Sequence, residues 1–199
     1  MTVTYFKRFR MQVDLRQGPG NSTSWRSVNS QTNQPVSLLG GYELRPWDNR
    51  LVSAHANAKY LSFQNEIDSN VFPCLGDAEG CLKLMNEISC RQGFMPAATW
   101  LATKTDHQTG QVQNCGTVQG IRDQVEVASI QNLGIVPEHR GHGIGSKLLE
   151  KSLVGFHSQG IKFVTLEVTS YNVGAIRLYR RMGFKIMRTV YKSAELNYA

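Results

Sequence analysis

Apolar and polar residues alternate along several stretches of the chain, which is the pattern of a half-buried β-strand. Val164, Leu166 and Val168, for example, are separated by polar residues. Strands are predicted on this basis at 5–15, 42–47, 98–103, 112–121, 125–136, 162–169 and 185–191. The polar turn at 106–110 predicts that the segments on either side of it form a hairpin.

Four further segments show helical spacing or signals of helix ends, and they span 48–67, 77–92, 143–157 and 172–182. Asp48 is placed to cap the first helix, and Gly93 to end the second. The face expected to be buried on the second helix consists of Leu82, Met85, Ile88 and Ser89. The third helix has the best-defined inner face, made by Ile144, Leu148, Leu149, Leu153 and Phe156.

The order of these elements defines the fold class. Antiparallel strands come first, and strands and helices alternate afterwards, which predicts an α+β fold with one mixed sheet and helices on its faces. Residues 17–40, rich in Ser, Asn, Gln, Thr, Gly and Pro, are expected to form a loop or connector. The chain therefore divides into an N-terminal strand and extension at 1–40 and a main domain at 41–199.

Composition narrows the class of protein. With 199 residues, 41% hydrophobic and 19% charged, the chain is typical of one globular domain with an extension. No apolar run approaches the ~20 residues that span a bilayer, and the basic N-terminus lacks the apolar segment of a signal peptide. The spacing of Cys74, Cys81, Cys90 and Cys115 fits no zinc motif, so no metal is expected. Reduced thiols are expected in the cytoplasm.

The net charge of +7 favours anionic partners. Six basic residues and no acid lie between Arg177 and Lys192. Such a cluster suits nucleic acid, a ribosome, the phosphates of a cofactor, or simply a solvated face. The chain lacks the aromatic stacking motifs of common RNA modules, which argues against nucleic acid as the partner.

The clearest chemical signal is a glycine-rich loop between a predicted strand and a predicted helix. Gly141, Gly143 and Gly145 alternate there, so several backbone amides can face one ligand without interference from Cβ atoms. The positive end of the helix dipole favours a pyrophosphate at this position. The loop matches neither the G-x-G-x-x-G pattern of dinucleotide folds nor the G-K-[ST] of nucleoside triphosphatases.

This loop resembles the acetyl-CoA motif [QR]-x-x-G-x-[GA] of the GNAT superfamily of N-acetyltransferases, which Arg140 to Gly145 match. A second block matches as well: 166–168, Asn172, Ala175, 178–179 and 183–184. The resemblance covers roughly 41–191. It implies the GNAT fold, with a mixed, mostly antiparallel sheet of six to seven strands flanked by about four helices. It also implies acetyl-CoA as co-substrate, no metal, and a primary amine as acceptor.

The resemblance assigns contacts with acetyl-CoA to the glycine-rich loop, to the strand before it, and to Asn172 and Tyr179. The strand before the loop is expected to pair with the pantetheine arm and to supply amides to the acetyl carbonyl. The full set comprises Leu133, Gly134, Ile135, Val136, Arg140, Gly141, His142, Gly143, Ile144, Gly145, Ser146, Asn172 and Tyr179. For Asn172 a simple helix N-cap remains an alternative.

Acetyl transfer needs a neutral amine and a protonated leaving thiol. Neutralising an amine of pKa about 10.4 at neutral pH costs roughly 4.6 kcal/mol, so a nearby base accelerates the reaction. The separation of Glu167 and Tyr179 is similar to that of the base and the acid of ribosomal-protein-alanine N-acetyltransferases, which implies Glu167, or a water relay, as base and Tyr179 as acid. The alternatives are a salt-bridge partner for Glu167 and a packed core residue for Tyr179.

The acceptor groove is expected at 60–75, where Phe63, Glu66, Asp68 and Phe72 suit a cationic amine. The N-terminal extension lies outside the resemblance, and three roles are open to it: covering the groove, completing a sheet or forming a homodimer. A non-catalytic acyl-CoA-binding regulatory module is the alternative function, because such a protein would keep the loop without the chemistry.

Overall fold

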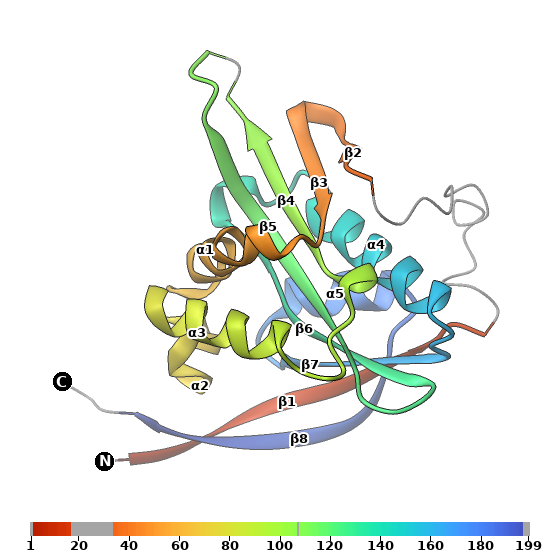
Figure 1. The fold of residues 1–199 in the computed structure, drawn as a ribbon. Helices are drawn as coiled ribbons and strands as arrows, with labels where there is room; N and C mark the ends of the chain where they lie inside the picture. Colours follow the sequence, from red (N-terminus) through yellow and green to blue (C-terminus); the bar gives the residue numbers. More distant parts are fainter. Residues whose placement is uncertain (1, 17–33, 107, 197–199) are drawn as a thin grey trace.

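The computed structural model describes residues 2–16, 34–106 and 108–196. The described strands form a single mixed sheet in the order β2-β3-β4-β5-β6-β7-β1-β8 (Figure 1). All neighbours are antiparallel except β6 and β7. The strands are β1 (Thr2–Asp14), β2 (Val36–Ser37), β3 (Tyr42–Pro46), β4 (Trp100–Thr105), β5 (Val112–Arg122), β6 (Val127–Ile135), β7 (Phe163–Thr169) and β8 (Lys185–Leu196).

The predicted strands are thus all present, and the α+β class is confirmed. The described sheet has eight strands rather than six to seven, because the two-residue β2 adds an edge strand to the seven that the sequence predicts. Of the loop or connector predicted at 17–40, residues 17–33 lie outside the described residues, and the rest contains β2 and the start of a 3₁₀ turn at Leu39–Gly41.

The N-terminal strand β1 completes the sheet by lying between β7 and β8. Its alternating sequence explains the position. Met11 and Val13 are buried in the main core, opposite Leu166 and Val164 of β7. The intervening residues, among them Arg8 and Arg10, therefore face the other side of the sheet. Of the three roles considered for the N-terminal extension, β1 therefore has that of completing the sheet.

Five α-helices cover the two faces of the described sheet: α1 (Val52–Phe63), α2 (Ile67–Val71), α3 (Ala78–Ser89), α4 (Ile144–Ser158) and α5 (Val173–Arg181). Helices α4 and α5 lie on one side of the sheet, and α1 to α3 lie on the other (Figure 1). The whole predicted inner face of α4 is buried. Among the described residues, no helix is both long enough and apolar enough to cross a membrane.

Two helix predictions need correction. The helix expected at 48–67 is broken: Asp48 caps a short 3₁₀ turn that leads into α1, and Glu66 has an extended backbone, so α2 starts afresh at Ile67. On α3, Leu82 is exposed rather than buried, and Cys81 takes the inward position beside Met85 and Ile88. Apolar spacing alone does not distinguish these neighbouring positions.

The parallel strands β6 and β7 separate part of the way along. They pair only between Val127–Ser129 and Phe163–Thr165. Beyond that point β6 carries a bulge, where the register against β5 shifts and Asn132 has a left-handed backbone with φ 47°. A bulge bends its strand and interrupts pairing. The two strands therefore splay apart beyond Ser129 and Thr165, which opens a gap in the middle of the sheet.

Candidate active site

Two cavities meet at this gap. One, of about 430 Å³, lies on the α2 side and is lined by β1, β6 and β7 residues; we call it the acceptor cavity. The other, of about 500 Å³, runs along the loop between β6 and α4; we call it the loop cavity. They share six lining residues, Phe63, Asp68, Leu133, Asn172, Ala175 and Tyr179. A molecule in one cavity can therefore contact a molecule in the other.

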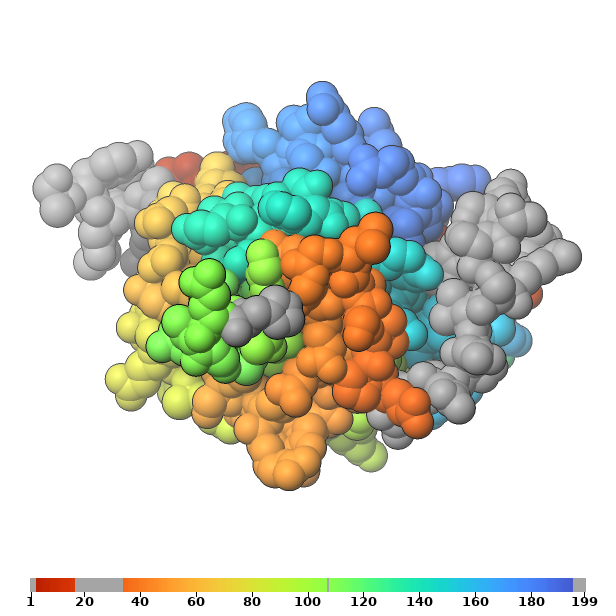
Figure 2. Space-filling model, turned by 90° about the horizontal axis from the view of Figure 1, so that it is seen from above, coloured from red at the N-terminus to blue at the C-terminus, as the bar shows by residue number. Residues whose placement is uncertain are grey.

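The loop cavity offers unpaired backbone amides. Within the described residues, the amides of Gly141, Gly143, Gly145 and Ser146 donate to no protein acceptor. Gly141 (φ 81°) and Gly143 (φ 76°) adopt left-handed conformations that other residues rarely reach. The loop lies exposed between β3 and α5, as the teal surface in Figure 2 shows. Free amides at the start of a helix bind an anion such as a pyrophosphate.

Gly134 is required for a different reason. A Cβ atom at this position would lie 2.6 Å from the Phe63 ring and 2.7 Å from the Cβ of Ser62. Helix α1 thus packs directly against the backbone of β6, and the absence of a side chain at Gly134 lets it approach this closely. The contact fixes the wall that both cavities share.

Arg140, the first residue of the glycine-rich motif, forms an ion pair and hydrogen bonds with other residues of the protein. Its Nη1 lies 2.7 Å from a carboxylate oxygen of Glu66. Its other nitrogens donate to the backbone oxygens of Ile135 (3.0 Å) and Ser62 (3.2 Å). Arg140 therefore ties the end of α1 and the α1–α2 connection to the loop. Glu66, the partner of Arg140, also has the extended backbone from which α2 starts afresh.

Most residues expected to contact acetyl-CoA line the loop cavity. Asn172 lines both cavities and also caps α5, since its side chain accepts from the amide of Ala175 at 3.0 Å. Two expected residues do not line it: Val136 is buried, and the exposed His142 turns its ring to the backbone oxygen of Arg140. The other ten expected residues do line the loop cavity: Leu133, Gly134, Ile135, Arg140, Gly141, Gly143, Ile144, Gly145, Ser146 and Tyr179.

Tyr179 lies where the two cavities meet, and it is 7% exposed. Burial raises the pKa of its phenol well above the ordinary value; Asp68 raises it further, and Arg8 opposes the shift. The hydroxyl therefore keeps its proton across the neutral range. A protonated phenol at this junction can donate a hydrogen bond to a group held in either cavity.

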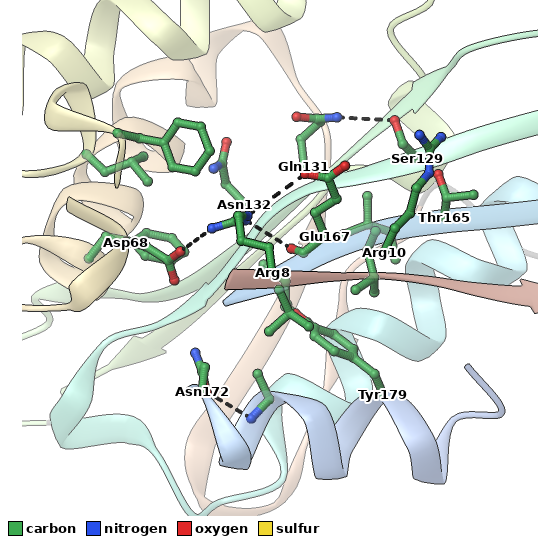
Figure 3. Close-up of a pocket in the computed structure, with 18 of the residues that line it drawn as sticks. Arg8, Arg10, Asp68, Ser129, Gln131, Asn132, Thr165, Glu167, Asn172 and Tyr179 are labelled. Atoms are coloured by element: carbon green, nitrogen blue, oxygen red, sulfur yellow. Dashed lines mark hydrogen bonds and ion pairs between the residues drawn. The ribbon is translucent and has the colours of Figure 1, made fainter. Parts of the chain in front are cut away.

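Glu167 projects into the acceptor cavity from the middle of β7, and Figure 3 shows its carboxylate among the polar residues there. The carboxyl side chain is 43% exposed, so it remains accessible to a ligand. The Nε atom of Arg8 lies 3.9 Å from it. Val164, Leu166 and Val168, the alternating residues of the strand, are buried on the opposite face as predicted.

Arg8 is the residue that sequence reasoning missed. Its guanidinium is buried and binds Asp68 at 2.8 Å and the Thr169 hydroxyl at 2.7 Å, and it stacks 5.0 Å from the Phe72 ring centroid. The Thr169 hydroxyl in turn donates to Asp68 at 2.8 Å. Alternation along β1 showed that Arg8 and Arg10 share a face, but only the position of β1 in the sheet brings that face to the site.

Three of the four residues expected at the acceptor groove line the acceptor cavity: Phe63, Asp68 and Phe72. The fourth, Glu66, does not, because it pairs with Arg140 on the loop side. The expectation for Glu66 is therefore corrected.

The bulge in β6 is supported by a buried lysine. Lys59 of α1 is fully buried, and its Nζ donates to the side-chain oxygen of Asn132 at 3.3 Å. Burial lowers the pKa of Lys59 to about 8. The hydrogen bond links α1 to the one residue of β6 with a left-handed backbone.

The basic residues between Arg177 and Lys192 do not gather at one site. Arg181 lines the loop cavity, whereas the Lys192 ammonium lies 3.9 Å from the centroid of the Phe72 ring. In the described part of the chain, no three His, Cys, Asp or Glu side chains gather as they would around a metal ion. The four cysteines are free thiols: Cys81 and Cys115 are buried, and Cys74 and Cys90 are exposed.

Comparison with known proteins identifies the family. The model described as "Acetyltransferase (GNAT) family" matches residues 81–184, just over half of the chain. The chain therefore belongs to the GNAT acetyltransferase family, as the two sequence blocks predicted. Among solved structures, a GCN5-related N-acetyltransferase from Sphaerobacter thermophilus has the same fold, with a TM-score of 0.61 and 22% identity over 94% of this chain and 50% of that one.

Curated relatives match shorter segments. An uncharacterized N-acetyltransferase of Methanocaldococcus jannaschii is 36% identical over 72 residues, which are 36% of this chain and 31% of that protein. The [ribosomal protein bS18]-alanine N-acetyltransferase of Escherichia coli is 29% identical over 91 residues, 44% of this chain and 60% of the relative. The matched segments thus span less than two thirds of these relatives.

Proposed function

We propose that the protein is an acetyl-CoA-dependent N-acetyltransferase that transfers the acetyl group directly to a primary amine. The loop cavity would hold acetyl-CoA, with the free amides of Gly141, Gly143 and Gly145 on its diphosphate. Arg181, which lines the same cavity, would contribute positive charge to that end of the molecule. The amine would enter through the acceptor cavity and meet the thioester at the junction.

In the proposed reaction Glu167 acts as the base and Tyr179 as the acid. Glu167, directly or through water, takes a proton from the amine, whose nitrogen then attacks the acetyl carbonyl carbon. The new C–N bond forms, the C–S bond breaks, and the coenzyme leaves as a thiolate. Tyr179 hydrogen-bonds the developing thiolate and supplies its proton, and the phenol is reprotonated by the proton that the acylated nitrogen loses as it becomes an amide. Residues 133–135 of β6 line the loop cavity, and Leu133 also lines the acceptor cavity, so backbone amides of this stretch would stabilise the oxyanion.

One observation supports this proposal above the others: Tyr179 belongs to the walls of both cavities and keeps its proton. A protein that only binds acyl-CoA needs the loop cavity but no second cavity meeting it at a proton donor. The alternative function, a regulatory acyl-CoA-binding module, is therefore less well supported. We further propose a cytoplasmic location, a reducing compartment in which the four cysteines would remain the free thiols that they are here.

The test is release of coenzyme A thiol from acetyl-CoA with a panel of peptides, polyamines and amino acids. We expect amine-dependent release by the wild type. Glu167→Gln should reduce turnover about 100-fold, because it removes the group that takes the proton of the amine. The matched control is Asp123→Asn, which neutralises another carboxylate of the same cavity, the one that the Ser129 hydroxyl contacts. This variant should retain most of the activity. Acetyl-CoA binding without transfer to any amine would favour the regulatory module.

A further inference from the structure

One cation in the acceptor cavity has no partner. Arg10 of β1 lines the cavity, yet within the described residues its guanidinium forms no hydrogen bond or ion pair. In the antiparallel register Arg10 lies directly opposite Glu167 of β7 on one side and Arg188 of β8 on the other. Directly opposed side chains share a face, with Cβ atoms roughly 5 Å apart. Figure 3 shows Arg10 and Glu167 entering the same cavity.

The other charged side chains that line the cavity already have partners within the protein. Asp68 is held by Arg8 and by the Thr169 hydroxyl, both at 2.8 Å. Asp123 accepts a hydrogen bond from the Ser129 hydroxyl at 3.1 Å.

The carboxylate of Glu167, 43% exposed and 3.9 Å from the Nε of the buried Arg8, and the guanidinium of Arg10 are both placed to contact a ligand in the cavity. These two groups have opposite charges, and their residues lie directly opposite each other on the neighbouring strands β1 and β7. A guanidinium binds a carboxylate through two parallel hydrogen bonds.

From this juxtaposition we propose that the acceptor is a small zwitterion, an amine that carries a carboxylate close to its nitrogen, as a free α-amino acid does. The proposal rests on the proposed function and names the class of its acceptor. The amine lies at Glu167, which takes its proton, and the carboxylate lies on Arg10. The α-amine of a peptide carries an amide in place of this carboxylate and leaves Arg10 without its partner. A polyamine brings a second cation to Arg10 and is repelled.

The experiment compares free L-amino acids with their carboxamides as acceptors, following thiol release from acetyl-CoA. We expect kcat/KM for the best free acid to exceed that for its carboxamide by about 10- to 100-fold, the value of one hydrogen-bonded ion pair. Arg10→Gln should abolish this preference by lowering kcat/KM for the acid alone. Arg188→Gln is the matched control, because Arg188 occupies the next strand in the same row but does not line the cavity.

Two results would overturn the proposal. One is equal or better acetylation of carboxamides, neutral peptides or polyamines by the wild type. The other is an equal effect of Arg10→Gln on acids and carboxamides. Both leave acetyl transfer itself intact, so they are distinct from failure of the proposed function.

A binding measurement decides the matter even if no acceptor is turned over. N-acetyl amino acids, the products, should raise the melting temperature of the wild type but not of Arg10→Gln, and N-acetyl amino acid amides should stabilise neither. Absence of any stabilisation by the N-acetyl amino acids would contradict the carboxylate site.

Discussion

Arg8 and Asp68 form an ion pair of 2.8 Å between the first strand and the short helix α2, although they are 60 residues apart in the chain. Their side chains are 7% and 13% exposed, and Asp68 belongs to the wall of both cavities. The pair fixes α2 over β1 and β7. It also places a positive and a negative charge near the Tyr179 phenol, with opposite effects on its pKa.

Breaking this pair should destabilise the fold. Asp68→Asn removes the closest counter-charge of the buried Arg8 guanidinium and leaves only Glu167, 3.9 Å from its Nε. Removing one partner of a buried ion pair typically costs about 3–5 kcal/mol. Denaturant unfolding monitored by fluorescence measures the change. Arg16→Gln removes the exposed partner of Asp14 and serves as control, with a much smaller expected effect. Equal losses in the two variants would show that the buried pair has no special importance.

The left-handed backbone of Gly143 should matter more for ligand binding than for stability. Gly143→Ala is expected to cost about 1–2 kcal/mol of stability and to weaken acetyl-CoA binding at least tenfold, because the strained loop reorients its amides. Gly110 has a similar φ (69° against 76°), and a Cβ at either position meets no atom within 4 Å. Gly110→Ala therefore controls for strain, and acetyl-CoA affinity measured by calorimetry should change only in the Gly143 variant.

Tyr179→Phe tests the proton donor. Loss of the hydroxyl should lower kcat about 100-fold or more and leave acetyl-CoA affinity nearly unchanged, because the ring is retained. The raised pKa of Tyr179 adds a second expectation. Since the phenol stays protonated through the neutral and mildly alkaline range, the wild-type rate should show no fall there from ionisation of Tyr179. A variant with unchanged kcat would remove Tyr179 from the mechanism.

Lys59 should make stability depend on pH in the alkaline range. Its pKa is lowered from 10.5 to about 8 in the fold, so between these values the unfolded chain binds more protons and stability rises with pH. Below pH 8 the buried charge has its full cost, on the order of 3 kcal/mol. Lys59→Met should therefore be more stable than the wild type at neutral pH, with the advantage shrinking as pH rises toward 10.5.

The exposed Lys83 on α3 gives the control. Lys83→Met should show no such pH-dependent difference in the free energy of unfolding. A constant difference between Lys59→Met and the wild type across this range would mean that the Lys59 ammonium is not destabilised by burial.

Much of the fold could be predicted from local pattern. The alternation around Glu167 identified β7 and the face that its carboxylate occupies, and the apolar spacing from Ile144 to Phe156 identified the buried side of α4. These features depend on residues close together in the chain, where hydrophobic periodicity carries the information.

What local pattern could not predict depends on strand order. Arg8 and Arg10 reach the cavity because β1 lies between β7 and β8, and no periodicity specifies which strands become neighbours. Nor does periodicity reveal that Glu66 pairs with Arg140, which joins two segments far apart in the chain and keeps Glu66 out of the acceptor cavity. Both misses are long-range pairings of charged residues. The roles of Glu167, Tyr179 and the loop residues in catalysis and binding remain predictions that the variants above test.

The most direct measurement is a calorimetric titration of the full chain with acetyl-CoA. Binding to the free loop amides predicts saturable heat with one molecule bound per chain, and markedly weaker binding by Gly143→Ala than by Gly110→Ala. Well-folded protein that gives no heat with acetyl-CoA at millimolar concentration would contradict the account.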